Sequence, residues 1–199
     1  MTTPAPAVSA WNLANVLTVA RLVLVPVFLL ALFADDGEST LWRVLAFVAF
    51  AVASFTDRID GEIARRRGLV TDFGKVADPI ADKALIGAAL IGLSLLDELP
   101  WWVTVLILVR EVGITALRFV VIRHGVLPAS RGGKLKTLLQ AVAIGLLVLP
   151  TTGLVHTAAL GVMAAAVVVT VVTGVDYVFR AVTLRRTSDR TARKRARLP

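Results

Sequence analysis

Long apolar stretches alternate with short polar connections along this chain. Six stretches are long enough, or nearly so, to cross a hydrocarbon core of about 30 Å, which requires about 20 helical residues. They are expected near residues 15–33, 42–64, 77–96, 100–122, 135–150 and 155–179. The fifth is short, but Lys134 and Lys136 at its start can extend toward the aqueous interface. The pattern predicts an all-α integral membrane fold with six transmembrane helices.

The composition agrees with a membrane protein. Hydrophobic residues make up 57% of the 199 positions, and charged residues only 18%. A bilayer solvates so much apolar surface directly, whereas a soluble domain of this size has too few charges to cover it. The chain contains no cysteine, which excludes disulfides, thiolate nucleophiles and cysteine-ligated metal centres.

The net charge of +8 is concentrated at the carboxyl end. Residues 180–199 contain eight Lys or Arg and one Asp, so they contribute +7 of this total. A basic tail directly after an apolar stretch is typical of a cytoplasmic flank near anionic membrane lipids. The charge therefore does not indicate a nucleic-acid partner.

The connections between the stretches differ in charge. Those near 34–41, 97–100 and 150–156 hold no Lys or Arg, whereas basic residues gather near 65–75 and 123–136. Because basic connections stay in the cytoplasm, both termini are predicted to be cytoplasmic in a multi-pass protein of the inner or plasma membrane. We expect an interfacial segment at 1–14, one six-helix domain at 15–180 and a basic cytoplasmic tail at 181–199.

Tryptophans stand at the ends of the expected spans. They are Trp11, Trp42, Trp101 and Trp102. Tryptophan is enriched where a membrane meets water, because its ring is apolar and its N–H is a donor. We therefore expect these side chains to act as interface anchors.

Four aspartates collect around the connection between the second and third stretches. At about 100° per helical residue, Asp57 and Asp60 share one face of the second helix, and Asp78 and Asp82 share one face of the third. A short cytoplasmic connection makes these helices antiparallel neighbours. The four carboxylates are therefore expected to converge in a polar active-site cavity that faces the cytoplasm.

Carboxylates this close repel one another and take up protons unless cations neutralise them. Their oxygens suit Mg²⁺ or Mn²⁺, and a pair of such ions about 3.5–4 Å apart is the usual arrangement for phosphoryl displacement. A cation-transport site is the alternative, since transporters also place carboxylates in membranes. A transport site lies near the midplane, whereas these aspartates adjoin a basic cytoplasmic connection. The pattern favours a two-metal transferase site.

The spacing of residues 57–82 is D-x2-D-G-x2-A-R-x8-G-x3-D-x3-D. It resembles the signature of the CDP-alcohol phosphotransferase family, and the six-span organisation extends the resemblance over most of the chain. The resemblance implies phosphatidyl transfer from a CDP-activated lipid such as CDP-diacylglycerol, with release of CMP. It implies that Asp57, Asp60, Asp78 and Asp82 bind metal and that Asp82 is the general base. It also implies donor binding by Gly61, Ala64, Arg65, Thr71 and Asp78.

Basic residues in and near the fourth and fifth stretches indicate an acceptor that carries a phosphate. The candidates are Arg110, Arg118, Arg131, Lys134 and Lys136. A neutral alcohol requires fewer cations. Arg110 lies deep enough in its span to need an anionic partner, for which Glu111 or an aspartate of the cluster is the natural choice.

Three segments resemble the phosphatidylglycerophosphate synthase branch of the same family. They are Asp78–Lys83, Arg110-Glu111 with Leu117-Arg118, and Gly133–Thr137 with Gln140. This resemblance implies glycerol 3-phosphate as acceptor and phosphatidylglycerol phosphate as product. A cardiolipin synthase of the family, with phosphatidylglycerol as acceptor, shares the aspartate region and is the main alternative. Inositol-phosphate-type acceptors are a further one.

The family resemblance also implies a homodimer. The stretch Gly87-Ala88-Ala89 with Gly92 is rich in small residues. Small residues let membrane helices approach closely. The sequence therefore offers this stretch as one surface for helix association.

Overall fold

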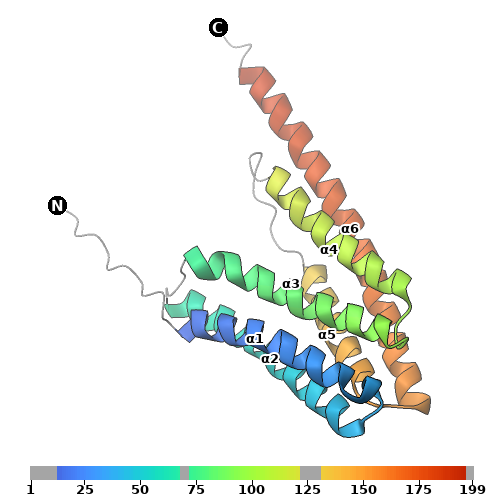
Figure 1. Cartoon of the computed structure of the whole chain (residues 1–199). Helices are drawn as coiled ribbons and strands as arrows, with labels where there is room; N and C mark the ends of the chain where they lie inside the picture. Colours follow the sequence, from blue (N-terminus) through green and yellow to red (C-terminus); the bar gives the residue numbers. More distant parts are fainter. Residues whose placement is uncertain (1–12, 68–71, 122–130, 196–199) are drawn as a thin grey trace, which may run out of the picture. The chain divides into compact units, whose positions relative to one another are not determined.

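The structure is a computed structural model that describes residues 13–67, 72–121 and 131–195. The described part is helical and contains no β-strand, as the apolar pattern predicts. Its elements are α1 (Leu13–Phe33), the 3₁₀ turn η1 (Ala34–Gly37), α2 (Thr40–Arg67), α3 (Asp72–Leu95), α4 (Trp101–Val121), α5 (Arg131–Val148) and α6 (Gly153–Arg195) (Figure 1). The six predicted helices are confirmed.

The chain forms two compact units. Unit 1 comprises residues 1–99 and 144–156 and contains α1, α2 and α3. Unit 2 comprises residues 100–143 and 157–199 and contains α4, most of α5 and most of α6. The aspartate motif belongs to unit 1, and all five predicted acceptor cations belong to α4 and α5 of unit 2.

In unit 1, α1 packs against both α2 and α3. The rings of Phe28 on α1 and Phe50 on α2 are buried, with their centroids 5.9 Å apart and their planes tilted by 48°. Gly92 on α3 faces the buried Leu32 on α1, and a Cβ at Gly92 would lie 2.6 Å from Leu32 Cδ2. A side chain at position 92 would therefore force Leu32 to shift.

The small residues of α3 are used for this internal packing. Gly87, Ala89 and Gly92 are buried within the unit, and Ala88 is half-buried. They therefore do not provide a free surface for a second subunit, and the homodimer remains a prediction without support from this stretch.

In unit 2, α4 and α6 lie side by side (Figure 1). Ile107 and Ile114 of α4 are buried, as are Met163, Ala166 and Tyr177 of α6. Polar side chains are also buried in this unit, where they form the cluster described below.

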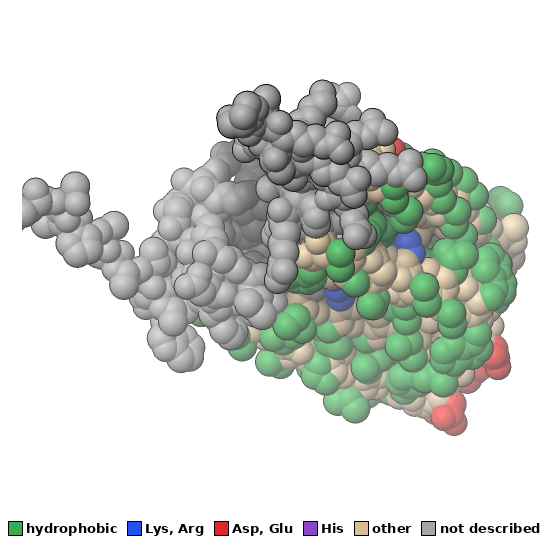
Figure 2. Space-filling view, turned by 90° about the horizontal axis from the view of Figure 1, so that it is seen from above, with side chains coloured by type: hydrophobic (Ala, Val, Ile, Leu, Met, Phe, Trp, Pro, Cys, Tyr) green, Lys and Arg blue, Asp and Glu red, His purple; other side chains and the backbone are tan. Residues whose placement is uncertain are grey.

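Large apolar side chains are exposed on the helices. Leu30 is 75% exposed, Phe119 is 72% exposed and Leu154 is 85% exposed. The described side chains visible in Figure 2 are mostly hydrophobic, with few charges among them. Such a surface is favourable in lipid and unfavourable in water.

Among the described residues, two helical segments are both long enough and apolar enough to cross a membrane. They are Val16–Gly37, with a mean hydropathy of 2.6, and Gly153–Leu184, with a mean hydropathy of 2.3. Thr40–Thr56 is a shorter apolar helical segment. The crossing of the membrane by all six helices stays a prediction.

The last helix is longer than the apolar pattern predicts. The expected span ends at residue 179, whereas α6 has 43 residues and continues to Arg195. No Gly or Pro stands between Gly174 and Pro199, and the Arg, Lys and Ala of this segment favour helix. Arg180 pairs with Asp176 one turn earlier, at 2.9 Å between Nε and Oδ2. The hydropathy pattern indicates where α6 is expected to leave the lipid. The helix itself continues beyond that point.

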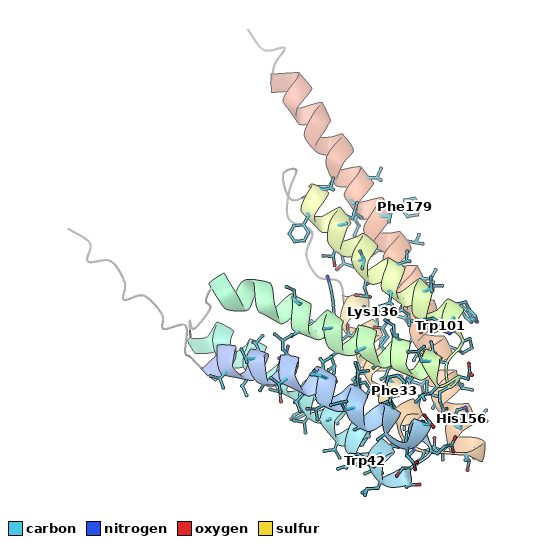
Figure 3. All side chains as sticks on the ribbon, in the orientation of Figure 1. Phe33, Trp42, Trp101, Lys136, His156 and Phe179 are labelled. Atoms are coloured by element: carbon cyan, nitrogen blue, oxygen red, sulfur yellow. The ribbon has the colours of Figure 1, made fainter. Side chains whose placement is uncertain are left out.

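The described tryptophans lie where anchors are expected. Trp42 is near the start of α2, and Trp101 is the first residue of α4 (both are labelled in Figure 3). Trp102 follows it in the same helix. Their exposed fractions are 44%, 48% and 62%, so all three rings are available to an interface. Trp11 lies outside the described residues.

Candidate active site

The aspartate motif lies on two helices, as its spacing predicts. Because α2 continues through Arg67, Asp57 and Asp60 are helical, and because α3 begins at Asp72, Asp78 and Asp82 are helical too. Residues 68–71 join these helices, and α2 contacts α3. Separations of three and four residues on helices place each pair of aspartates on one face.

The side chains of residues 57–79 lie outside the described part of the structure, and so does Thr71 as a whole. Asp82 belongs to the described part: its side chain is half-buried and takes part in at least one polar or electrostatic interaction. The described side chains contain no group of three acidic or histidine residues able to hold a metal ion. Since three of the four aspartates are not among them, the convergence of the carboxylates stays a prediction.

The donor set nevertheless fits a hard divalent cation. Four carboxylates on two contacting helices supply the oxygen ligands that Mg²⁺ and Mn²⁺ prefer. Gly61 and Ala64 are one residue and four residues after Asp60 on the same helix, and both are small. Arg65 follows directly and adds a positive charge suited to phosphate.

A second polar cluster lies within unit 2, around Glu111. Arg110 Nη1 donates a hydrogen bond to Glu111 Oε1 at 3.1 Å, and the ammonium of Lys136 on α5 donates to the same oxygen. The side chains of Arg110, Glu111 and Lys136 are 13%, 22% and 6% exposed. The predicted pairing of Arg110 with Glu111 is confirmed.

Threonines of α6 complete this cluster. Arg110 Nη2 donates to Thr173 Oγ1 at 3.0 Å, and Thr173 Oγ1 in turn lies 2.6 Å from the carbonyl of Val169. One turn earlier, Gln140 Nε2 of α5 donates to Thr170 Oγ1 at 3.1 Å. Buried polar groups need such partners, and these hydrogen bonds join three helices of the unit. The buried Nε of Arg110 has no hydrogen-bond partner.

The structure therefore brings together two of the five cations predicted for the acceptor phosphate, Arg110 and Lys136. Lys134 is exposed on α5. Arg118 on α4 and Arg131 at the start of α5 are placed as helical residues, and their side chains lie outside the described part.

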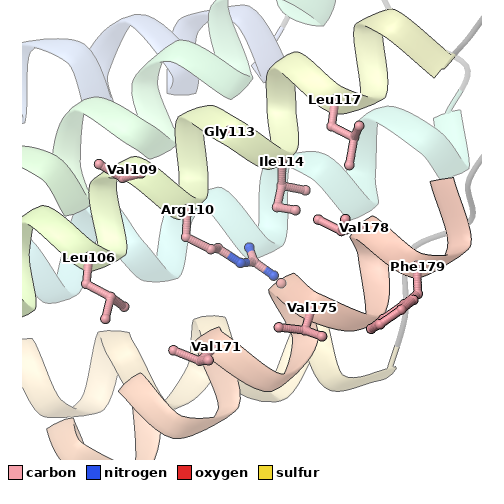
Figure 4. Close-up of a pocket in the computed structure, with 11 residues that line it drawn as sticks. Leu106, Val109, Arg110, Gly113, Ile114, Leu117, Val171, Val175, Val178 and Phe179 are labelled. Carbon is pink, nitrogen blue, oxygen red and sulfur yellow. The ribbon is translucent and has the colours of Figure 1, made fainter. Parts of the chain in front are cut away.

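A largely apolar pocket of about 580 Å³ lies between α4 and α6, with Arg110 in its wall (Figure 4). Gly113 of α4 and Gly174 of α6 also line it. The stem of Arg110 passes close to Gly174, where a Cβ would lie 3.3 Å from Arg110 Cγ. The missing side chain at Gly174 thus leaves room for the arginine to cross toward Thr173.

Sequence reasoning missed a buried arginine in unit 1. Arg43 of α2 is 4% exposed and donates to the last carbonyls of α5, from Nε to Val148 O at 2.7 Å and from Nη2 to Leu147 O at 2.8 Å. Its Nη2 also lies 3.0 Å from Glu98 Oε1. The residue caps the carboxyl end of α5 and binds it to the connection before α4.

A signal for Arg43 was present in the sequence. It adjoins connections that otherwise carry only acidic charge, so it is a basic residue on the flank where basic residues are disfavoured. Such an exception is expected when the charge has a buried partner.

Known proteins with similar sequences belong to the same family that the aspartate motif resembles. The sequence model of the CDP-alcohol phosphatidyltransferase family matches residues 11–172. A probable phosphatidylglycerophosphate synthase from Mycobacterium tuberculosis (strain H37Rv) is 65% identical over 170 residues, covering 85% of this chain and 81% of the relative. A CDP-diacylglycerol–glycerol-3-phosphate 3-phosphatidyltransferase from Rickettsia felis is 40% identical over 171 residues, covering 83% and 93%.

A cardiolipin synthase (CMP-forming) from Streptomyces coelicolor is more distant. It is 34% identical over 114 residues, which cover 57% of this chain and 53% of the relative. The family match spans residues of both compact units and includes the whole aspartate motif. The chain belongs to the CDP-alcohol phosphatidyltransferase family.

Proposed function

We propose that this protein transfers the phosphatidyl group of CDP-diacylglycerol to glycerol 3-phosphate, giving phosphatidylglycerol phosphate and CMP. The observation that carries the proposal is the complete aspartate motif on two contacting helices of a chain 65% identical to a probable phosphatidylglycerophosphate synthase. Family membership sets aside the cation-transport interpretation of the aspartates.

In this proposal the metal site is formed by Asp57, Asp60, Asp78 and Asp82, which would hold two Mg²⁺ or Mn²⁺ ions. Their carboxylate oxygens are ligands of the right kind, and their helical spacing is the observation that supports a shared site. Bound ions of this type polarise a pyrophosphate and offset the charge that develops on it.

Asp82 is the proposed general base. Its carboxylate accepts the proton of an acceptor hydroxyl, and the hydroxyl oxygen then attacks the phosphorus that bears diacylglycerol. The bond from that phosphorus to the oxygen bridging to CMP breaks, and CMP leaves. The half-buried position of Asp82 on α3 suits a base that must be shielded and still reach a substrate.

The remaining proposed roles concern binding. The cytidine diphosphate part of the donor is assigned to Gly61, Ala64, Arg65, Thr71 and Asp78. The acceptor phosphate is assigned to Arg110, Arg118, Arg131, Lys134 and Lys136, because guanidinium and ammonium groups form charge-assisted hydrogen bonds with phosphate. The paired, buried Arg110 and Lys136 support this assignment most directly.

The protein's setting is part of the proposal. The exposed apolar surface and the charge of the connections support a multi-pass protein of the cell membrane with both termini in the cytoplasm. We also propose a homodimer, as the family resemblance implies.

The test is turnover by purified protein in detergent or liposomes with CDP-diacylglycerol, Mg²⁺ and separate acceptors. Glycerol 3-phosphate should yield phosphatidylglycerol phosphate and one CMP per product, measured by lipid mass spectrometry and nucleotide release. A chelator should abolish the reaction, and Mg²⁺ or Mn²⁺ should restore it.

The same panel separates the alternatives. If phosphatidylglycerol were converted to cardiolipin while glycerol 3-phosphate was ignored, the acceptor assignment would be wrong and the transferase chemistry would stand. If inositol phosphate were the only acceptor converted, the acceptor assignment would again be wrong and the transferase chemistry would stand.

A further inference from the structure

Glu111 occupies an unusual place in the unit 2 cluster, because two cations from different helices meet at one of its oxygens. Arg110 Nη1 and the Lys136 ammonium both donate to Oε1 (Lys136 is labelled in Figure 3). All three side chains are largely buried. One carboxylate therefore sets the position of two positive charges.

The local geometry shows that this arrangement is not a passive contact between helix neighbours. Adjacent residues of a helix point about 100° apart and do not normally face each other. Arg110 nevertheless turns to Glu111 with one terminal nitrogen, while its other terminal nitrogen bonds Thr173 on α6. Its guanidinium is thus held at two points on two helices.

The energetics of buried ion pairs favour a role beyond stability. Desolvation of buried charges offsets much of their attraction, so apolar residues of similar volume are often as stabilising. Among the described side chains, this cluster places two cations beside one carboxylate in a poorly solvated place. Two neighbouring cations of this kind are suited to binding an anion.

We propose that Glu111 is a positioning residue for the acceptor: it holds Arg110 and Lys136 in the arrangement that receives the acceptor's phosphate. The inference rests on the proposed function. Arginine and lysine side chains lose considerable rotational freedom when they bind a ligand. By fixing both beforehand, Glu111 lowers the entropic cost of binding glycerol 3-phosphate, and it does so without touching the substrate.

The decisive variant is Glu111→Gln, which keeps the shape and one acceptor oxygen and removes the charge. KM for glycerol 3-phosphate should rise about tenfold or more, because the hydrogen bonds that hold both cations lose the carboxylate's negative charge and weaken. KM for CDP-diacylglycerol should stay within about twofold, since that substrate is bound elsewhere. Inhibition by inorganic phosphate should weaken in parallel with the rise in KM.

Two further variants complete the design. Glu111→Asp keeps the charge on a shorter stem and should give an intermediate KM for glycerol 3-phosphate. Asp176→Asn removes the carboxylate of an exposed ion pair in the same unit, with Arg180, and should leave both KM values unchanged. Thermal unfolding of each variant in detergent distinguishes loss of fold from loss of positioning.

The inference is overturned if Glu111→Gln leaves KM for glycerol 3-phosphate within about twofold of wild type, whatever its effect on unfolding. A fall in that KM also overturns it, because the carboxylate would then only compete with phosphate for the cations. If Glu111→Gln does not fold, the same two criteria apply to Glu111→Asp. Failure of the wild type to use glycerol 3-phosphate is a different result and refutes the proposed function itself.

Discussion

Arg43 shows how a single side chain can replace several missing backbone partners. The last carbonyls of a helix have no partners inside the helix, and in the membrane they cannot be left unsatisfied at low cost. Arg43 supplies donors to two of them, Leu147 and Val148, and balances its charge with Glu98. The planar guanidinium suits this task because its donors point in several fixed directions.

Replacing Arg43 should therefore destabilise unit 1. We expect Arg43→Ala to lower the free energy of unfolding by about 3–5 kcal/mol, because it leaves a carboxylate and two carbonyls without their donor. Arg43→Lys should recover only part of this, since one ammonium cannot match the fork of donors. Unfolding in detergent measures the effect, and Arg180→Ala, at an exposed ion pair, is the control that should leave stability unchanged.

The partners of Arg43 illustrate the limit of sequence reasoning at this scale. Leu147 and Val148 are 104 and 105 positions away along the chain. No local pattern connects them, so the sequence predicts at most that a basic residue on an acidic flank needs a partner. Glu111 was predictable as a partner of Arg110 because it is adjacent, whereas the meeting of Lys136 with the same oxygen depends on how α4 and α5 pack.

At the motif, Asp82→Asn should separate catalysis from metal binding. Turnover should fall by roughly 100-fold or more because the amide cannot accept the proton. Metal affinity should be largely kept, since three other carboxylates remain. Asp57→Asn and Asp78→Asn should weaken metal affinity as well. Steady-state kinetics with a metal titration test this, and near-normal turnover of Asp82→Asn would show that another group is the base.

At the scale of helices, the apolar pattern predicted the number of helices and most of their ends. The expected 15–33 and 100–122 correspond to α1 at Leu13–Phe33 and α4 at Trp101–Val121. The agreement has a physical cause, because a span must be both helical and about 20 residues long to cross lipid. Beyond the lipid this constraint disappears, which is why the end of α6 was not predictable from hydropathy.

The packing of α1 against α3 depends on Gly92, and this gives a prediction for helix contacts. Gly92→Ala should destabilise the protein by about 1–3 kcal/mol, because the new methyl group overlaps the buried Leu32 side chain. Leu32→Val in the same chain should recover part of the loss, since the two changes are in contact.

Gly161 of α6 provides the matched control for that experiment. A Cβ there meets nothing within 4 Å, so Gly161→Ala should be neutral or slightly stabilising through its effect on helix propensity. Equal effects at the two glycines, measured by unfolding in detergent, would show that close packing against Leu32 is not what Gly92 provides.

For the whole molecule, the charge of the connections predicts which side each faces. Because the chain contains no native cysteine, single cysteines can be introduced cleanly at Ser39, beside η1, and at Ser188, within α6. A membrane-impermeant thiol reagent applied to sealed cells should label Ser39→Cys and should reach Ser188→Cys only after the membrane is opened. Labelling of both from the same side would contradict six crossings.

The uninterrupted length of α6 has a mechanical consequence. At 1.5 Å per residue its 43 residues extend for about 65 Å, roughly twice the hydrocarbon core. With neither Gly nor Pro after Gly174 until the last residue, no hinge separates the part in lipid from the part beyond it. The helix therefore acts as a lever: a tilt of about 10° within the bilayer displaces its far end by roughly 11 Å. Thinner or thicker membranes change the tilt of spanning helices. A small change in bilayer thickness therefore moves the carboxyl-terminal end of α6 by a distance large enough to measure with a distance probe.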